Sequence, residues 1–334
     1  MRKKTTIDDV AREAGVSRQT VSRAINGMEG ISAGTRERIM EMVHVMGYQP
    51  SRLARGMAGS QTKTIGLIIG NITNPTQAEI FQNLYKFAEG ENYNIMLRNT
   101  NYESELELKS VYSLISENVD GIVFLSPTLT SSQLADFEQG DRPIVVINRS
   151  VSAKHISSIV SDMTRATKSV VEYLIGTGHQ TIGLITRLGS LDNNRHFCGY
   201  MQAVKSRGLS TSPDLVFQNE ITLLGGYLAA QQLLTKSNGV TAITTYNDLM
   251  ALGAMKAFEE RGLSVPDSIA VFGYDDIPYA SYSTPTLSSI RINSEKVALY
   301  AFHRIKEMIA QPEVIFPEAV LDIDLVLRES TMRS

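Results

Sequence analysis

The chain has few of the features that mark secreted, membrane-embedded or metal-binding proteins. Among 334 residues there is one cysteine, Cys198, so the sequence contains neither a disulfide framework nor a cysteine metal site. No apolar run approaches the roughly 18 residues that a membrane-spanning helix requires. The basic residues 2–4 are followed by Thr-Thr-Ile-Asp-Asp, which does not fit a signal peptide. We therefore expect a protein of the reducing cytoplasm with no membrane partner.

Motifs for catalysis are also missing. The sequence has no Gly-x-Ser-x-Gly motif, and its five histidines show no metal-ligand spacing. Residues 59–64 resemble a phosphate loop but lack its second glycine and precede an expected strand instead of following one. Asp275 and Asp276 could act as acid and base, or could equally accept hydrogen bonds from a polyol. We expect no enzyme, no cofactor and no metal.

Charge is distributed unevenly along the chain. Residues 1–60 contain ten Lys and Arg against six Asp and Glu, a balance of +4, which leaves −7 for the remainder of a chain whose total is −3. A basic N-terminal module on an acidic body is typical of a nucleic-acid-binding head on a regulatory domain, although chance asymmetry could produce the same modest excess.

The stretch 6–26 predicts two short helices joined at Gly15. Thr6 and Asp9 have the spacing of a capping box, and apolar residues recur at helical intervals on one face of each helix. Ser17 can cap the second helix. On its outward face, Arg18, Gln19, Ser22 and Arg23 are the residue types that hydrogen-bond to base edges in the DNA major groove. The pattern indicates a helix-turn-helix, with a solvated polar face as the alternative.

A third helix from Ser32 to about Met46 would complete a module of about 50 residues. Pro50 then begins the basic, glycine-interrupted segment 50–60, in which Leu53 and Met57 are i, i+4 neighbours. A helix this short is marginal alone because nucleation is costly. The segment is therefore either a plain linker or an element that folds on DNA or on a second copy of the chain.

From Thr64 onward, apolar strands alternate with amphipathic helices, which predicts α/β structure with parallel sheets covered on both faces. After a link near 155–161 the pattern repeats, so two similar lobes are expected. We expect strands at 64–69, 93–97, 121–125, 143–147, 181–186, 215–218, 241–245, 270–274, 287–292 and 319–326.

The loops that follow these strands are rich in neutral hydrogen-bonding residues. In doubly wound sheets ligands bind beyond the carboxyl ends of the strands, and two facing lobes form a cleft. Each polar residue alone is a common turn former or helix cap. Together they suit a small polar ligand such as a sugar.

These segments together resemble the lactose/galactose repressor family of bacterial transcriptional regulators. The resemblance runs from about Thr5 to the end of the chain. It is carried by DVAREAGVSRQTVSRAIN, TRERI and MGYQPSRLARGM in the head, and by TTYNDLMALGAMKA, VPDSIAVFGYDD and STPTLSSI in the body.

The resemblance implies a helix-turn-helix head, a hinge helix and a periplasmic-binding-protein-like core whose lobes exchange strands. It implies a homodimer on a palindromic operator in the bacterial nucleoid. The implied divisions are the head 1–49, the hinge 50–60, a first lobe of 61–160 and 291–322, and a second lobe of 161–290 and 323–334.

The resemblance also implies roles for individual residues. Base or phosphate contacts fall on Ser17, Arg18, Gln19, Thr20, Ser22, Arg23 and Asn26, and minor-groove contacts on Leu53, Ala54 and Met57. Asp275 and Asn247 match effector-binding positions. The expected effector site comprises Asn71, Thr76, Ser126, Arg195, His196, Asn247 and Asp275.

Three departures from the family pattern refine these expectations. Met57 stands where a leucine usually wedges into DNA. His196 occupies the place of the pocket arginine, and Arg195 is one residue earlier, so either could fill that role. Thr76-Gln77 replaces an aromatic pair, which favours a polyol or sugar acid over a purine. The chain also lacks a leucine-heptad tail, which favours a dimer.

The sequence thus predicts a DNA-binding transcriptional regulator, a repressor of carbohydrate-utilisation genes that responds to a sugar, sugar phosphate or sugar acid. A sugar-binding transport protein would share the two-lobed core, but the basic head and the missing signal peptide disfavour it. An enzyme ranks third.

Overall fold

The computed structural model describes residues 5–25, 28–48, 61–137, 142–189, 191, 194–236 and 239–332. The chain divides into two compact units, residues 1–63 and 64–334, and each is described by itself. The hinge residues Leu53, Ala54 and Met57, like Asn26 of the head, lie outside the described residues.

The head contains three short helices, α1 (Ile7–Glu13), α2 (Arg18–Ile25) and α3 (Ala33–Val45). The predicted capping box at the start of α1 is confirmed, because the Thr6 hydroxyl accepts from the Asp9 amide and the Asp9 carboxylate accepts from the Thr6 amide. Gly15 makes the turn to α2 with φ of +64°, a conformation that glycine adopts without strain. Ser32 caps α3, also as predicted.

A small apolar core holds these helices together. Val10, Val21 and Ile39, one from each helix, are fully buried against one another. Arg36 of α3 donates to the carbonyl oxygens of Ala24 (3.4 Å) and Met28 (2.6 Å), which satisfies backbone acceptors where α2 ends. The core therefore fixes which face of α2 remains exposed.

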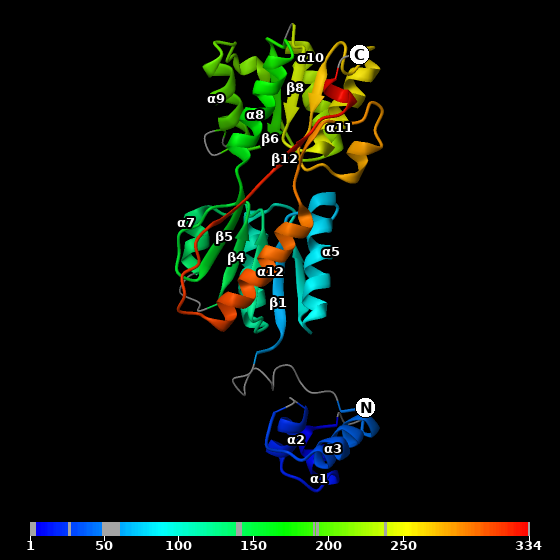
Figure 1. The fold of residues 1–334 in the computed structure, drawn as a ribbon, viewed down its shortest axis with the longest axis vertical. Coiled ribbons are helices and arrows are strands. Elements are labelled where there is room, and N and C mark those ends of the chain that lie inside the picture. Colours follow the sequence, from blue (N-terminus) through cyan, green and yellow to red (C-terminus); the bar gives the residue numbers. More distant parts are fainter. Residues whose placement is uncertain are drawn as a thin grey trace. The chain divides into compact units, whose positions relative to one another are not determined.

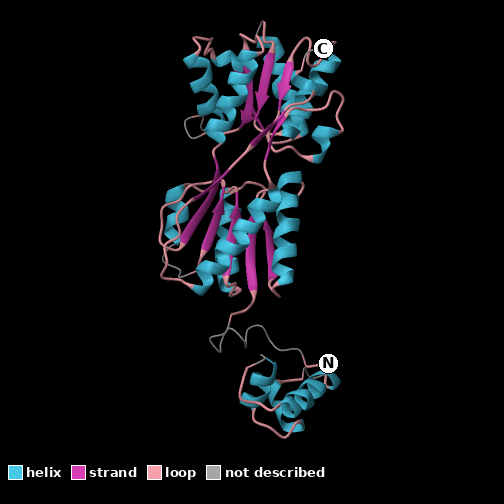
Figure 2. Ribbon diagram, viewed as in Figure 1, coloured by secondary structure: helices cyan, strands magenta, loops and turns pink. Residues whose placement is uncertain are grey.

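The second unit begins with a six-stranded parallel sheet in the order β11-β5-β4-β3-β1-β2. Helices cover both of its faces (Figure 2). Buried side chains of α5 and α12 pack on one face and those of α6 and α7 on the other. The elements are β1 (Thr64–Ile69), α5 (Pro75–Gly90), β2 (Asn94–Asn99), α6 (Ser104–Ser116), β3 (Gly121–Leu125), α7 (Ser131–Ala135), β4 (Ile144–Ile147), β5 (Ile156–Ser161), α12 (Ser294–Ala310) and β11 (Ala319–Leu321).

A second parallel sheet, in the order β7-β6-β8-β9, forms the other lobe. Helices α10 and α11 pack on one face, and α8 and α9 on the other. The elements are α8 (Met163–Gly176), β6 (Ile182–Arg187), α9 (Arg195–Ser206), β7 (Val216–Asn219), α10 (Leu223–Lys236), β8 (Ala242–Thr245), α11 (Asp248–Glu260) and β9 (Ala270–Phe272). The predicted fold class, a helical head with two doubly wound parallel-sheet lobes, is confirmed.

The chain passes between the lobes three times (Figure 1). The passages lie between β5 and α8, between β10 (Ser289–Arg291) and α12, and between β11 and β12 (Asp324–Val326). Strands β10 and β12 pair antiparallel beside the second sheet.

Two predictions about these passages were wrong. The expected link at 155–161 contains β5, a fully buried strand that pairs with β4 and β11. The expected strand 319–326 is two strands, because the chain leaves the first sheet after Leu321 and pairs with β10 from Asp324. The local pattern of apolar residues cannot show this change of sheet, because β11 and β12 are both extended and differ only in the strand with which each pairs.

None of the helices in the described segments is both long and apolar enough to cross a bilayer.

Candidate functional site

A cavity of about 880 Å³ lies between the two lobes of the second unit. Its wall comes from the residues that follow the carboxyl ends of β1, β3 and β4 in one lobe and of β6, β8 and β9 in the other. Because both sheets are parallel, these ends bring the polar loops of each lobe to one edge. Loops far apart in sequence are thus gathered around one volume.

All seven residues of the expected effector site line this cavity. The first lobe contributes three of them and the second lobe four. They are Asn71, Thr76, Ser126, Arg195, His196, Asn247 and Asp275.

Several polar residues of the cavity wall also form hydrogen bonds within the protein. The Asn247 side-chain oxygen caps α11 by accepting from the Met250 amide at 3.0 Å, and that of Asn74 caps α5. The Ser126 hydroxyl accepts from the Asn148 amide group at 3.0 Å. Capping fixes the rotamers of Asn74 and Asn247, so their remaining amide N–H groups are held in place before any ligand arrives.

Three buried polar atoms on the cavity wall have no hydrogen-bond partner among the described residues. They are Arg149 Nε, His196 Nε2 and the Tyr274 hydroxyl. Buried polar groups in folded proteins are almost always hydrogen-bonded, since an unmade bond costs about 1–3 kcal/mol. Their convergence on one cavity indicates a site for a polar ligand.

His196 lies at the start of α9, between two tyrosine rings. Its ring centroid is 4.6 Å from that of Tyr246 and 4.8 Å from that of Tyr274. Burial, reinforced by the Arg187 guanidinium, lowers the pKa of His196 to about 3. The ring is therefore neutral near pH 7. Its Nδ1 lies 3.3 Å from the Thr167 hydroxyl, and Nε2 remains for a ligand.

Asp275 projects from the end of the segment that follows β9. Its backbone has φ of +110°, outside the range that non-glycine residues ordinarily adopt, and is held by the Asp275 amide donating to the Ile290 carbonyl at 2.8 Å. Burial raises the pKa of Asp275 to about 7, and the nearby Thr76 hydroxyl opposes that shift. The Asp275 carboxyl therefore takes up a proton at a much higher pH than an ordinary aspartate does.

Sequence reasoning missed several cavity residues. Arg149, two residues beyond β4, and Arg187, the last residue of β6, both line the wall, as do the aromatic residues Tyr102 and Tyr246. A charged side chain directly after a buried strand is a signal that could have identified both arginines. The Tyr102 hydroxyl accepts from the Gln77 amide at 3.1 Å, and burial raises the pKa of Tyr102.

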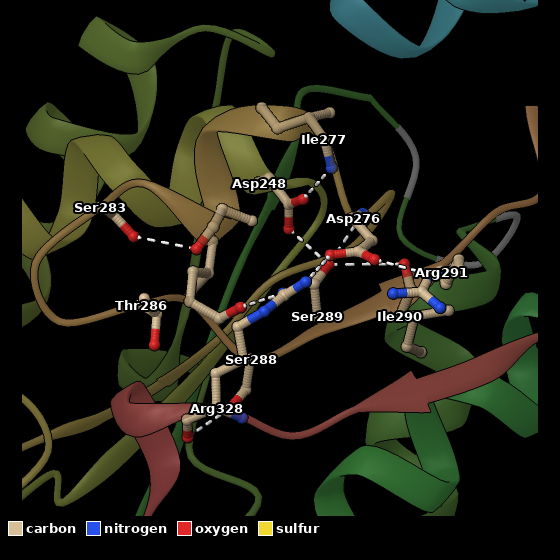
Figure 3. Close-up of polar contacts among 12 residues, drawn as sticks. Asp248, Asp276, Ile277, Ser283, Thr286, Ser288, Ser289, Ile290, Arg291 and Arg328 are labelled. Atoms are coloured by element: carbon tan, nitrogen blue, oxygen red, sulfur yellow. Dashed lines mark hydrogen bonds and ion pairs between the residues drawn. The ribbon is translucent and has the colours of Figure 1, made fainter.

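Next to Asp275, a polar cluster ties the second lobe to the passing strands (Figure 3). Asp276 forms ion pairs with Arg291 of β10 and with Arg328, which follows β12, each at 2.7 Å. Ser289 of β10 donates to buried Asp248 at 2.6 Å and accepts from the Asp276 amide at 3.0 Å. Burial, with Asp275 nearby, raises the pKa of Asp248 well above its usual range. Asp275 thus lines the cavity, while the next residue, Asp276, binds the strands that pass between the lobes.

In the head, α2 presents the predicted base-reading residues. Ser17, Arg18, Gln19 and Arg23 are exposed, and Thr20 and Ser22 are partly buried. The Ser17 hydroxyl accepts from the Thr20 amide at 3.1 Å and so caps α2. Asp8 of α1 lies 4.0 Å from Arg18, a surface pair that contributes little stability.

A helix-turn-helix head with an exposed basic second helix, joined to a two-lobed core with a polar cavity, defines a class: DNA-binding regulators with a ligand-binding core. Residues 6–51 match the model for bacterial regulatory proteins of the lacI family, and residues 171–331 match that for periplasmic binding protein-like domains. The chain belongs to the lacI family of bacterial regulatory proteins.

Individual relatives agree with this assignment. The chain is 31% identical to the probable HTH-type transcriptional repressor ExuR of Bacillus subtilis over 98% of each chain. It is 32% identical to catabolite control protein A of Priestia megaterium over 85% of this chain and 86% of that protein. A solved structure of the lac repressor dimer bound to operator and the anti-inducer ONPF superimposes with a TM-score of 0.85 at 27% identity, covering 99% of this chain and all of the other. The family consists of DNA-binding transcriptional regulators, and this chain is one.

Proposed function

We propose that the protein is a cytoplasmic repressor whose binding to an operator in the nucleoid is controlled by a small polar ligand in the cavity between the lobes. The observation that carries this proposal is the convergence of three unpartnered buried polar atoms on that cavity. An unfilled hydrogen-bonding wall fits a protein that exists in ligand-free and ligand-bound states.

Sequence reading is assigned to α2. Arg18, Gln19 and Arg23 extend from one exposed face and have the donor and acceptor geometry for guanine and adenine edges. Contacts with the DNA backbone would set the position of α2, and we assign them to Ser17, Thr20, Ser22 and Asn26. One such helix covers a half-site, which supports a homodimer on a palindromic operator. We assign residues 50–60 to the hinge, with Leu53, Ala54 and Met57 in the minor groove.

The ligand can control DNA binding only by binding one arrangement of the lobes more tightly than another. Asp275 faces the cavity, and Asp276, the next residue, holds Arg291 and Arg328 on the two passages formed by β10 and β12. A ligand that draws on Asp275 therefore acts on a backbone that also anchors these passages. We propose that this connection couples ligand occupancy to lobe arrangement.

The test begins with the DNA. An operator is selected from random duplexes with the full-length protein, and its affinity is compared with that of Arg23→Ala. Loss of a bidentate base contact should cost about 1–3 kcal/mol at one base pair and relax specificity there. The same loss on every sequence would identify Arg23 as a phosphate contact instead.

The ligand response is tested separately with Asp275→Asn. This variant should retain operator affinity and lose the change in affinity that a cavity ligand produces in the wild type. Arg207→Gln, at the exposed C-terminal end of α9, is a control for a charge change outside the cavity and should behave as wild type. An unaltered ligand response in Asp275→Asn would disprove the assignment of this cavity.

A further inference from the structure

Three arginines from two lobes line one cavity. Arg149 follows β4 in the first lobe, Arg187 ends β6 in the second, and Arg195 begins α9 in the second. All three are partly buried. Guanidinium groups are permanently charged and hold carboxylate or phosphate through paired N–H donors.

The described residues provide no carboxylate that forms an ion pair with any of these three arginines. Arg149 donates from one terminal nitrogen to the Pro127 carbonyl at 3.2 Å, whereas its buried Nε has no partner. Glu220 also lines the cavity, but its side chain is exposed. Burial lowers the pKa of Arg149 most, and the like charges of Arg187 and Arg195 lower it further, whereas the buried carboxylate of Glu107 raises it. Arg149 is therefore repelled across the cavity by Arg187 and Arg195, and Glu107 offsets part of that repulsion.

Asp275 gives the cavity wall a second kind of group. Burial raises the pKa of Asp275, and the Thr76 hydroxyl opposes that shift. Tyr246 also lines the cavity, and the Arg187 guanidinium carbon lies 6.0 Å from the centre of its ring. Asp275 reinforces the upward shift that burial gives the Tyr246 pKa, whereas Arg187 and Arg149 oppose it. The arginines thus favour an anion, and Asp275 favours hydroxyl donors, with neutral His196 on the same wall.

We infer that the ligand is an anionic carbohydrate, a sugar carrying a carboxylate or a phosphate, with its charged group held by Arg149, Arg187 and Arg195 and its hydroxyls toward Asp275. The inference rests on the proposed function, which places a ligand in this cavity. A neutral sugar would leave Arg187 and Arg195 without an ion pair among the described residues, and Arg149 with only the partial compensation that Glu107 provides. An anion between Arg149 of one lobe and Arg187 and Arg195 of the other replaces repulsion across the cavity by attraction, which draws the lobes together.

The test uses the full-length protein and calorimetric titration. The probes are hexuronates and aldonates for the carboxylate arm, hexose and pentose phosphates for the phosphate arm, and the neutral parent sugar of each. We expect at least one anionic probe to bind at least ten-fold more tightly than its neutral parent. The arm that contains this probe identifies the charged group. Its affinity should fall as salt concentration rises.

Variants then assign the charge to the arginines. Arg149→Gln and Arg187→Gln should each weaken the anionic probe at least ten-fold while changing the affinity of its neutral parent less than two-fold. The control variant Arg207→Gln removes the same charge as these two variants, but at the end of α9 and outside the cavity. It should bind the probe as wild type does. Arg149→Lys should recover only part of the affinity, because an ammonium cannot form the paired contact.

Three results would overturn the inference: a neutral parent that binds as tightly as its anion, cavity variants that bind the anion as wild type does, or no anionic probe that binds below 10 mM. They are distinguishable from failure of the proposed function. If a neutral sugar binds and Asp275→Asn abolishes its binding, the cavity remains the effector site and only its charge preference is refuted. Operator selection with ligand-free protein tests the DNA-binding role independently.

Discussion

Asp275 and Asp276 are adjacent carboxylates with opposite surroundings. Asp276 is compensated within the protein, since it forms ion pairs with Arg291 and Arg328. Asp275 forms no ion pair among the described residues, and neither do the three cavity arginines, although buried Glu107 attracts Arg149. Around Asp276, aspartate and arginine pair with each other, and we call Asp276, Arg291 and Arg328 the closed network. Around the cavity, Asp275 and the three arginines form no ion pair among the described residues, and we call them the open network. The closed network holds the passing strands in place, whereas the open one retains its capacity for a ligand.

The difference indicates where the protein gives up stability for function. Uncompensated charges and unmade hydrogen bonds reduce the free energy of unfolding, and proteins retain them where a ligand completes them. The four predictions below separate the two networks, beginning with the largest effect.

Neutralising Asp276, which pairs with two arginines, should lower the free energy of unfolding more than any other change. Asp276→Asn removes the charge that compensates Arg328, whose side chain is only 16% exposed. Removing one partner of a buried ion pair leaves an uncompensated buried charge, and we expect a loss of about 3 kcal/mol in the free energy of unfolding of the core. Urea denaturation followed by circular dichroism measures this loss. A cost below about 1 kcal/mol would mean that the cluster does not secure the passages.

The open carboxylate should make ligand binding depend on pH. Hydroxyl groups donate to the ionised form, so binding lowers the pKa of Asp275 from about 7 and releases a proton. Affinity should be highest above about pH 7 and should fall about ten-fold between pH 8 and pH 6 as the carboxyl becomes protonated. Titrations with a hexuronate, whose own carboxylate stays ionised in this range, measure the effect. Asp275→Asn should bind weakly without this slope; an identical slope in the variant would assign the proton elsewhere.

Removing one of the unpaired cavity arginines should stabilise the ligand-free protein slightly. Arg149→Gln removes a buried charge that Arg187 and Arg195 repel and that Glu107 attracts, and because burial and the repulsion by Arg187 exceed that attraction, we expect the unfolding free energy to rise by less than about 1 kcal/mol. Denaturation without ligand measures this gain. Destabilisation by the same amount would show that the hydrogen bond to Pro127 and the attraction of Glu107 together outweigh the repulsion.

The smallest effect should come from Arg291, the exposed member of the closed network. Its side chain is 51% exposed, and Asp276 keeps Arg328 when Arg291 is lost. Arg291→Ala should therefore cost less than about 1 kcal/mol of unfolding free energy, in line with surface ion pairs. A loss as large as that of Asp276→Asn would mean that the two arginines act as a unit.

Much of the fold followed from local pattern. The capping box at Thr6, the cap at Ser32 and the alternation of strands and helices depend on neighbours in sequence, and the structure agrees with them. The local pattern missed the strand β5 and the division between β11 and β12, because it does not report which strand an extended segment pairs with. The lobe boundary between residues 322 and 323 came only from the family resemblance.

The cavity was predicted unevenly for a similar reason. Polar residues after strands indicated a ligand site, and the family pattern supplied Asn247 and Asp275. Arg149 and Arg187 do carry a local signal, a charge at or just beyond the end of a buried strand, but that signal does not say what the charge faces. Their meaning comes from facing one another across two lobes, a relation that no local spacing encodes.

The three passages between the lobes also set an order for biosynthesis. The head needs only its own three helices, so it can fold while the rest of the chain is still being translated. The first lobe cannot be completed at the same stage, because α12 and β11, which supply part of its core, are encoded after residue 290. Until then a nascent chain exposes the apolar faces of β1 and α5 that α12 will cover. We therefore expect C-terminal truncations before residue 321 to accumulate as aggregates or chaperone substrates, even though truncations after residue 161 leave the first five strands of that lobe intact.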